Sequence, residues 1–293
     1  MPEGTAGSTV PRRQLGRYLR DLRNRAGMTV RGSAKALEWS EPKLWRIETG
    51  QVSMRSLDVR NMCEIYGAPA ELTEALMGLA KETKSRGWWH AYGDVLPEWF
   101  DLFVGLEEAA SDLAWYENEL VPGLLQTERY AAEITRIHVP DLSEEQVDQR
   151  VRLRADRQRI LHRPAGAPTL HAVLNEGVLH RAVGGTAVMA EQLAHLVYVS
   201  EQANVLLRVV PFAAGAHQGV ISGPFIVLRF PEDARGNAEP PTVYKDGFTG
   251  GLYLDKATEV NRYTAAFQGI WDSAADEKAS QRLIAEAARG YED

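Results

Sequence analysis

The chain has 293 residues, enough for two domains with separate cores, and a formal net charge of −7 at pH 7. Its single cysteine, Cys63, excludes an intramolecular disulfide framework, and no stretch approaches the ~18 consecutive apolar residues of a membrane span. The N-terminal residues lack an apolar run, so we expect no signal peptide, no membrane partner and a cytoplasmic location.

Residues 1–11 are rich in small and polar side chains, and we expect them to be disordered. Beyond them, apolar residues recur at the spacing of one helical face: Leu15, Leu19, Leu22 and Ala26. This stripe predicts a first helix.

Residues 29–50 predict two further helices joined by a short turn. Thr29 and Ser40 are both good N-caps, because each side-chain oxygen can accept a hydrogen bond from a free helical N–H. Leu37, Leu44 and Ile47 supply the apolar positions that close the pair against a helical core. The segment therefore favours a helix-turn-helix, with a generic helical bundle as the alternative.

The exposed face of the third predicted helix carries Glu41, Lys43 and Arg46. These residue types read base edges and bind phosphates, so we expect Lys43 and Arg46 to reach bases and Glu41 to accept from cytosine N4 or exclude other bases. Ser40 and Thr49 are expected to contact phosphate, and three further arginines the DNA backbone. The predicted DNA-binding residues are Ser40, Glu41, Lys43, Arg46, Thr49, Arg12, Arg13 and Arg55.

This region resembles the helix-turn-helix of the lambda-repressor/Cro (XRE) family. The resemblance rests on LGRYLRDLRNRAG as the first helix and RIETG as the end of the recognition helix, and we place the domain at residues 12–82. In that family the Glu at the position of Glu48 usually pairs with an Arg of the first helix. Arg23 occupies the corresponding place, so the resemblance implies a structural salt bridge between Arg23 and Glu48.

Two positions depart from the family pattern. Glu38 stands in the turn where the family most often has Gly, and a positive φ there costs a non-Gly residue about 1 kcal/mol. Gly32 lies inside the second predicted helix, at about the same cost relative to Ala. Neither change breaks the motif.

The charge is distributed unevenly along the chain. Residues 11–60 hold 12 basic and five acidic residues, a balance of +7, which leaves −13 for residues 61–293 once Glu3 is counted. A basic region can bind phosphates, whereas the acidic remainder would be repelled from them. This asymmetry favours a DNA-binding module joined to a domain with another role.

Two more helices, at residues 57–66 and 70–82, would complete a five-helix domain. An aromatic-rich linker is expected at residues 83–100. We interpret its aromatic cluster as interdomain or dimer packing, because it lacks the interleaved basic residues of a single-strand binder. The cluster comprises Trp88, Trp89, Tyr92, Trp99, Phe100 and Phe103.

Residues 101–293 predict a C-terminal sensor and dimerisation domain of mixed structure. Helices are expected at residues 102–119, after Thr127, from Ser143 to Leu161, at 189–201, at 257–275 and at 277–289, and an arginine run from Arg150 to Arg163 is interpreted as a solvated face. Short strands are expected at TLHAVLN, NVLLRVVP, PFIVLRF, TVYKD and GLYL, the first two paired in parallel, and a mobile loop at residues 232–241. The predicted fold class is α+β: an all-α five-helix domain followed by a mixed α/β domain with about five short strands.

No catalytic motif stands out, and we predict no enzyme, no cofactor and no metal. His171, Glu176 and His180 are a weak alternative as metal ligands, because no fourth ligand is evident. The glycine-rich loop around His217 could wrap a small ligand or peptide, although a simple strand connection explains it better. His217 is therefore a weak ligand candidate.

Two stretches, GLEEAASDLAWYENELVPGLLQTERYA and LLRVVPFAAGAHQGVISGPF, resemble the C-terminal domain of unknown function of WhiJ-like or Scr-type antitoxin-like actinobacterial regulators, most specifically in VPGLLQT and Tyr130-Ala131. The resemblance implies a DNA-binding regulator, often encoded beside a small partner protein. We predict a homodimeric, nucleoid-associated repressor that binds double-stranded DNA at a palindromic operator and senses a ligand or partner. The alternative is an antitoxin-like protein that neutralises a small acidic or basic protein encoded nearby and binds DNA for autoregulation; an enzyme tethered to DNA is a third reading.

Overall fold

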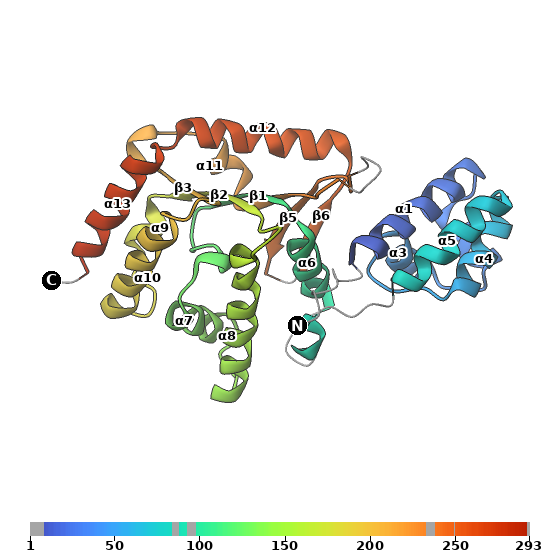
Figure 1. Cartoon of the computed structure of the whole chain (residues 1–293), viewed down its shortest axis with the longest axis horizontal. Helices are drawn as coiled ribbons and strands as arrows, with labels where there is room; N and C mark the ends of the chain where they lie inside the picture. The colour runs from blue at the N-terminus through green and yellow to red at the C-terminus, as the bar shows by residue number, and fades with distance from the viewer. Residues whose placement is uncertain (1–8, 84–87, 93–97, 233–237, 249, 292–293) are drawn as a thin grey trace. The chain divides into compact units, whose positions relative to one another are not determined.

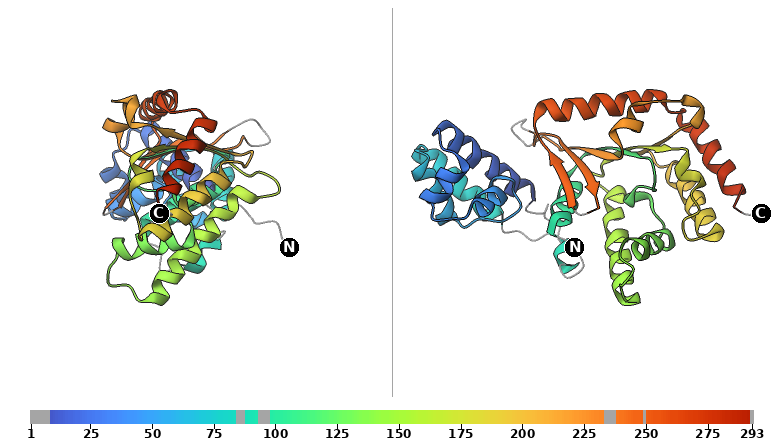
Figure 2. Two further views of the ribbon diagram at one scale, coloured as in Figure 1. Left: turned by 90° about the vertical axis from the view of Figure 1, so that its left-hand side faces the viewer. Right: turned by 180° about the vertical axis from the view of Figure 1, so that it is seen from behind.

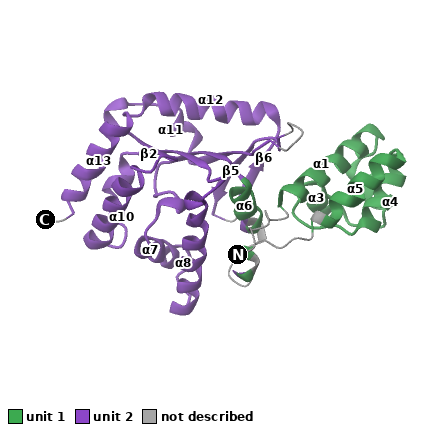
Figure 3. Cartoon of the chain, in the orientation of Figure 1, with its two compact units in different colours: residues 1–91, 101–109 green, residues 92–100, 110–293 purple. Residues whose placement is uncertain are grey.

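The computed structural model describes residues 9–83, 88–92, 98–232, 238–248 and 250–291. It divides into two compact units (Figure 3). Unit 1 comprises residues 1–91 and 101–109, and unit 2 comprises residues 92–100 and 110–293. No helix in these described ranges is long and apolar enough to cross a membrane.

Unit 1 is all-helical over its described residues and begins with the five predicted helices (Figure 1). Their bounds are α1 Thr9–Arg25, α2 Val30–Ala36, α3 Glu41–Glu48, α4 Ser56–Ile65 and α5 Ala70–Glu82. The predicted apolar stripes meet in one core, in which Leu19, Leu44, Val59 and Cys63 are fully buried. This confirms the all-helical N-terminal region.

The start of α1 differs from the prediction. Thr9 to Pro11 form the first turn of the helix, where proline is tolerated because its missing N–H would have no partner. The rest of the segment predicted to be disordered, residues 1–8, lies outside the described residues. Gly16 is required further along α1, since a Cβ there would lie 2.5 Å from the Ile47 carbonyl oxygen of α3.

Part of the aromatic segment belongs to unit 1. The 3-10 helix η1 (Trp88–Tyr92) places Trp89 in a fully buried position, where its indole N–H donates to Asp101 at 2.8 Å. The Trp88 N–H donates to Glu108 at 3.1 Å, and both acids lie on α6 (Glu98–Ala109). Residues 84–87 and 93–97 of the predicted linker lie outside the described residues.

Unit 2 contains, in its described part, a six-stranded mixed sheet of order β3-β2-β1-β4-β5-β6. The strands are β1 Asp112–Glu117, β2 Thr169–Asn175, β3 Val205–Val210, β4 Phe225–Arg229, β5 Thr242–Gly247 and β6 Gly250–Leu254. β1, β2 and β3 run parallel and β4, β5 and β6 antiparallel, so the parallel pairing predicted for β2 and β3 is confirmed.

Helices cover both faces of this sheet (Figure 1; Figure 2 shows the reverse side). Helix α12 packs on one face through Val260, Phe267 and Ile270, which meet buried side chains of β1, β2, β4 and β5. The other long helices lie on the opposite face or beside β3. The helices are α7 Glu128–His138, α8 Glu144–Gln158, α9 Gly177–His180, α10 Thr186–Val199, α11 Gln218–Ser222, α12 Ala257–Ser273 and α13 Glu277–Arg289.

The helix predicted at residues 102–119 is wrong in its second half. Helix α6 ends at Ala109, and residues 112–117 form β1, which brings the described sheet to six strands rather than about five. β1 lies between β2 and β4 with both faces covered, so its four central residues are all buried and show no alternation of exposed and buried positions. Leu113 lies at helical spacing from the apolar residues of α6, so the apolar pattern predicted a helix where the strand lies.

Helix α8 carries the predicted capping box, since the Ser143 hydroxyl accepts from the Gln146 N–H and the Gln146 side chain accepts from the Ser143 N–H. The helix ends at Gln158, and the 3-10 turn η3 (Arg159–His162) follows. The arginine run is not uniformly solvated, because Arg157 is buried. Of the predicted mobile loop, residues 233–237 lie outside the described residues and Glu232 pairs with Ala238 in an antiparallel bridge.

Candidate nucleic-acid interface

The turn between α2 and α3 has the geometry of a tight helix end. The Trp39 N–H donates to the Ala34 carbonyl at 2.8 Å and the Glu38 N–H to the Lys35 carbonyl at 3.2 Å, which are the two bonds of a Schellman motif. Glu38 between them has φ = 56°. The sequence-based expectation of a positive φ at Glu38 is thus met.

Replacing Glu38 by Gly is expected to raise the free energy of unfolding of unit 1 by about 1 kcal/mol, because glycine adopts this left-handed conformation without a steric penalty. Hydrogen exchange of the α2 and α3 amides measures the change locally. The matched control is Lys35→Gly in the same helix, which should destabilise by a comparable amount. Shifts of equal sign for the two glycines would contradict the assigned strain.

Helix α3 is anchored at both ends. The Ser40 hydroxyl accepts from the Lys43 N–H at 3.3 Å, and Pro42 occupies the first turn, where no N–H is needed. At the other end the Thr49 hydroxyl donates to the Trp45 carbonyl at 2.8 Å, and Gly50 adopts φ = 73°. A Cβ on Gly50 would lie 2.6 Å from the Arg13 Cα, so the position also requires glycine for the close approach to α1.

One side of α3 faces the core and the other faces solvent. Leu44 and Ile47 are buried, whereas Glu41 and Arg46 are exposed. Lys43 is half-buried, since its ammonium packs 3.8 Å from the centre of the Trp39 ring. The base-reading set predicted from the sequence therefore lies along the outward side of one helix.

Trp45 was missed by the sequence reasoning. Its side chain is 54% exposed, next to Arg46 on the outward side of α3. Trp45 thus adds a large, partly apolar side chain to the exposed side that carries Arg46. Its neighbours one helical turn away in the sequence, Glu41 and Glu48, are both acidic, and this signal could have placed Trp45 outside the apolar stripe.

The predicted structural pair is present in unit 1. The Arg23 guanidinium donates from Nε and a terminal nitrogen to the two Glu48 carboxylate oxygens, at 2.6 and 2.8 Å, and from the other nitrogen to the Met28 carbonyl at 2.8 Å. Both side chains are under 10% exposed. The hydrogen bonds that Arg23 donates to Glu48 raise the pKa of Arg23, and the pair ties α1 to α3.

Two of the arginines predicted to contact the DNA backbone are buried in this structure. Arg12 and Arg13 are buried within unit 1, and Arg12 lies 4.0 Å from Asp101. Burial lowers the pKa of Arg12, because desolvation disfavours its charged form. Both arginines are therefore directed into the protein in this structure. Arg55, by contrast, is exposed at the start of α4.

The histidines and Glu176 of unit 2 do not assemble into a metal centre. His171 lies 3.1 Å from Asp112 and packs edge-on against Trp271, whereas Glu176 and His180 lie 3.7 Å apart at the two ends of α9. Within the described residues no group of three potential ligands is close enough to hold a metal ion. His217 caps α11 by accepting from the Gly219 N–H at 3.1 Å.

Glu117 lies at the end of β1, where burial perturbs its carboxyl group. Desolvation by burial raises its pKa to about 7, although the Trp115 indole N–H donates to its carboxylate at 3.0 Å. At pH values between the unfolded pKa near 4.3 and the folded pKa of about 7, Glu117 is protonated in the folded state and ionised in the unfolded state. Stability of unit 2 should therefore fall as pH rises across this window.

We expect Glu117→Gln to remove this loss and to stabilise unit 2 by about 1–2 kcal/mol at pH 8, with little effect at pH 4. Thermal unfolding midpoints of the wild-type and variant chains between pH 4 and pH 8 measure the difference. Parallel curves with a constant offset would show that Glu117 does not titrate in this range.

Comparison with known families gives two matches. A family model described as "Helix-turn-helix domain" matches residues 14–76, and one described as "Domain of unknown function (DUF5753)" matches residues 100–286. These matches confirm the predicted order of a helix-turn-helix domain followed by a C-terminal domain of unknown function. No curated protein and no solved structure matches the chain.

Proposed function

Because the chain belongs to the DUF5753 family and begins with a helix-turn-helix domain, we propose that it is a sequence-specific transcriptional regulator. In this proposal α3 enters the major groove of double-stranded DNA and the C-terminal unit senses a ligand or partner. The helix-turn-helix domain indicates DNA binding; repression is our inference.

The observation that carries the proposal is the outward side of α3. Arg46 and Glu41 are free of the core, and Trp45 lies between them in sequence with more than half of its side chain exposed. A recognition helix presents this combination to base edges, with arginine donating to guanine and glutamate accepting from cytosine. Ser40, Thr49 and Arg55 are proposed to contact phosphates around it.

A single recognition helix makes few base contacts, so we propose that two copies bind together. In a homodimer two α3 helices would reach half-sites about one DNA turn apart, and the operator would be palindromic. We further propose that the protein acts at the nucleoid in the cytoplasm.

Fluorescence anisotropy with the full chain tests the DNA-binding step. Labelled duplex DNA is titrated at several salt concentrations, and the affinity should fall steeply with salt because each phosphate contact releases counterions. The acidic remainder of the chain would not produce this behaviour alone. Binding that is absent at low salt would contradict the proposal.

A second candidate is supported by exposed apolar side chains in the connection from β3 to β4. Phe212, Val220 and Ile221 are 63%, 67% and 88% exposed. Such a group is typical of a protein-binding surface, and would suit capture of a small protein encoded nearby, as an antitoxin-like protein would do. Co-purification of that protein with the wild-type chain, and its loss with Ile221→Ser, would support this candidate over ligand sensing.

A further inference from the structure

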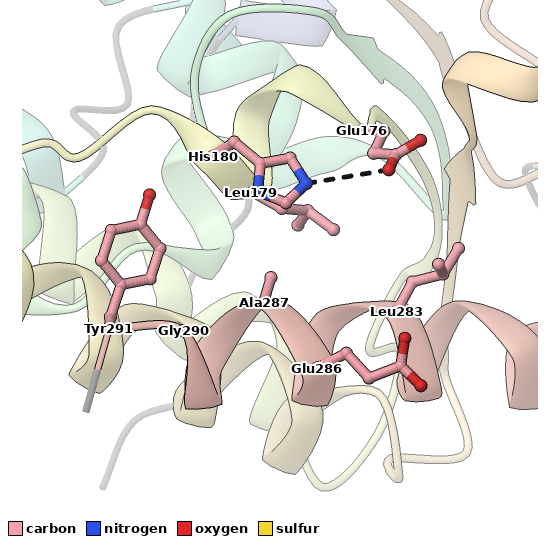
Figure 4. A pocket seen from close by; sticks show the side chains of 8 residues that line it. All are labelled: Glu176, Leu179, His180, Leu283, Glu286, Ala287, Gly290 and Tyr291. Atoms are coloured by element: carbon pink, nitrogen blue, oxygen red, sulfur yellow. Dashed lines mark ion pairs between the residues drawn. The ribbon is translucent and has the colours of Figure 1, made fainter. Parts of the chain in front are cut away.

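A cavity of about 440 Å³ lies between α9 and α13 in unit 2 (Figure 4). Its apolar lining residues are Leu179 of α9 and Leu283 and Ala287 of α13. Glu176, His180 and Glu286 line it with polar atoms, and Tyr291 lies at the end near the C-terminus. The volume falls within the range of small-molecule sites.

The cavity has a definite place in the sheet topology. Glu176 follows directly after the last residue of β2, and its N–H donates to the carbonyl of Val210, the last residue of β3, at 3.0 Å. The cavity thus opens beside the carboxyl ends of two parallel strands. In sheets with parallel strands, ligands bind in the crevice outside these ends.

The polar groups of the cavity are fixed by their neighbours. One Glu176 oxygen lies 3.7 Å from the His180 Nε2, and the other accepts from the Phe212 backbone N–H. The Phe212 ring stacks on His180 with ring centres 6.4 Å apart. Burial raises the pKa of Tyr291, so its phenol stays neutral at pH 7 and retains its proton as a donor.

The charge of the lining is one-sided. Two carboxylates, Glu176 and Glu286, line the cavity, and none of the described lining residues is an arginine or a lysine. Arg282 and Arg289 share helix α13 with Glu286, yet they are exposed and do not line the cavity. Among the described residues Glu286 forms no ion pair, so its carboxylate is available to a ligand.

We propose that this cavity binds a small organic cation, an amine or guanidinium attached to an apolar body. The apolar body lies on Leu179, Leu283 and Ala287, and the cationic group donates hydrogen bonds to Glu286 and is attracted by Glu176. A neutral analogue loses the charge-assisted bond, and an anion is repelled by both carboxylates. The inference rests on the proposed function in that this cation would be the ligand sensed by the C-terminal unit.

Isothermal titration calorimetry with the full chain tests the site directly, using benzylamine as the probe and benzyl alcohol and benzoate as neutral and anionic analogues. Benzylamine should bind, and the two analogues should bind at least about tenfold more weakly because each lacks the charge-assisted bond. A dipeptide with one lysine side chain is titrated in parallel. Binding of that dipeptide without binding of benzylamine would overturn the assignment to a free small molecule.

Glu286→Gln should weaken benzylamine binding about tenfold without changing the thermal midpoint, because Glu286 is exposed. The matched control is Glu145→Gln, an exposed acid on α8 outside the cavity, which should leave binding unchanged. Equal affinities of wild type and Glu286→Gln, or no preference for the amine, would overturn the proposal. DNA affinity is measured separately, without benzylamine. If benzylamine does not bind but DNA does, the cation site is wrong and the proposed DNA binding is not affected.

Discussion

Glu48→Ala is expected to lower the free energy of unfolding of unit 1 by about 3–5 kcal/mol, the largest effect of any single substitution considered. The variant leaves the Arg23 guanidinium under 10% exposed and still donating to the Met28 carbonyl, but without a counter-ion at the position of Glu48. A buried charge without its counter-ion carries the full cost of desolvation. The first helix and the recognition helix would then lose their ionic connection.

Native-state hydrogen exchange detected by mass spectrometry measures this change within unit 1, because the α1 and α3 amides report local stability apart from unit 2. The matched control is Glu41→Ala, an exposed acid on the same helix, which should shift stability by less than about 0.5 kcal/mol. The double replacement Arg23→Leu with Glu48→Leu should recover much of the loss, because it removes both charges together. Similar protection in wild type and Glu48→Ala would show that the pair does not stabilise the domain.

Arg46→Ala is expected to weaken binding to the preferred DNA sequence by about 1–3 kcal/mol and to relax preference at one base position. The physical reason is that an exposed guanidinium on the outward side of α3 can donate two bonds to one guanine, and alanine can donate none. Affinity for unrelated sequences should change much less. Competition titrations with single-base variants of the preferred duplex identify the position.

Arg55→Ala provides the contrast for this prediction. Arg55 is exposed at the start of α4, and a phosphate contact there should weaken all sequences about equally and lower the salt dependence of binding. Arg46→Lys should retain the charge but lose the bidentate geometry, and so resemble alanine in specificity. If Arg46→Ala bound the preferred and random duplexes with wild-type affinities, the base-reading role of Arg46 would be wrong.

Local signals in the sequence predicted most of the elements. Capping residues located α3 and α8, because a capping hydroxyl accepts from an N–H of the helix that it begins. Gly67 with Pro69 separated α4 from α5, because glycine and proline act on the local backbone. The five predicted strands agree closely with β2 to β6, since short apolar runs are bounded there by turn residues. The parallel pairing followed from the helix between β2 and β3.

Tertiary features could not be predicted in the same way. β1 is buried on both faces, so its residues carry no periodic signal that separates a central strand from a buried helix. The burial of Arg12 and Arg13 depends on packing within unit 1 and leaves no mark in the local sequence. The cavity beside α13 joins residues more than 100 positions apart, and Leu283 and Ala287 alone indicate only an ordinary helix face.

The exposed side of α3 is proposed to read DNA sequence, and selection of duplexes from a random pool by the full-length wild-type chain measures this directly. The enriched sequence and a shuffled version of it are then compared at one fixed salt concentration. We predict an inverted repeat with half-site centres about 10 base pairs apart, bound at least ~10³-fold more tightly than the shuffled duplex. Equal affinity for the two duplexes, or no enrichment over the starting pool, would contradict the account.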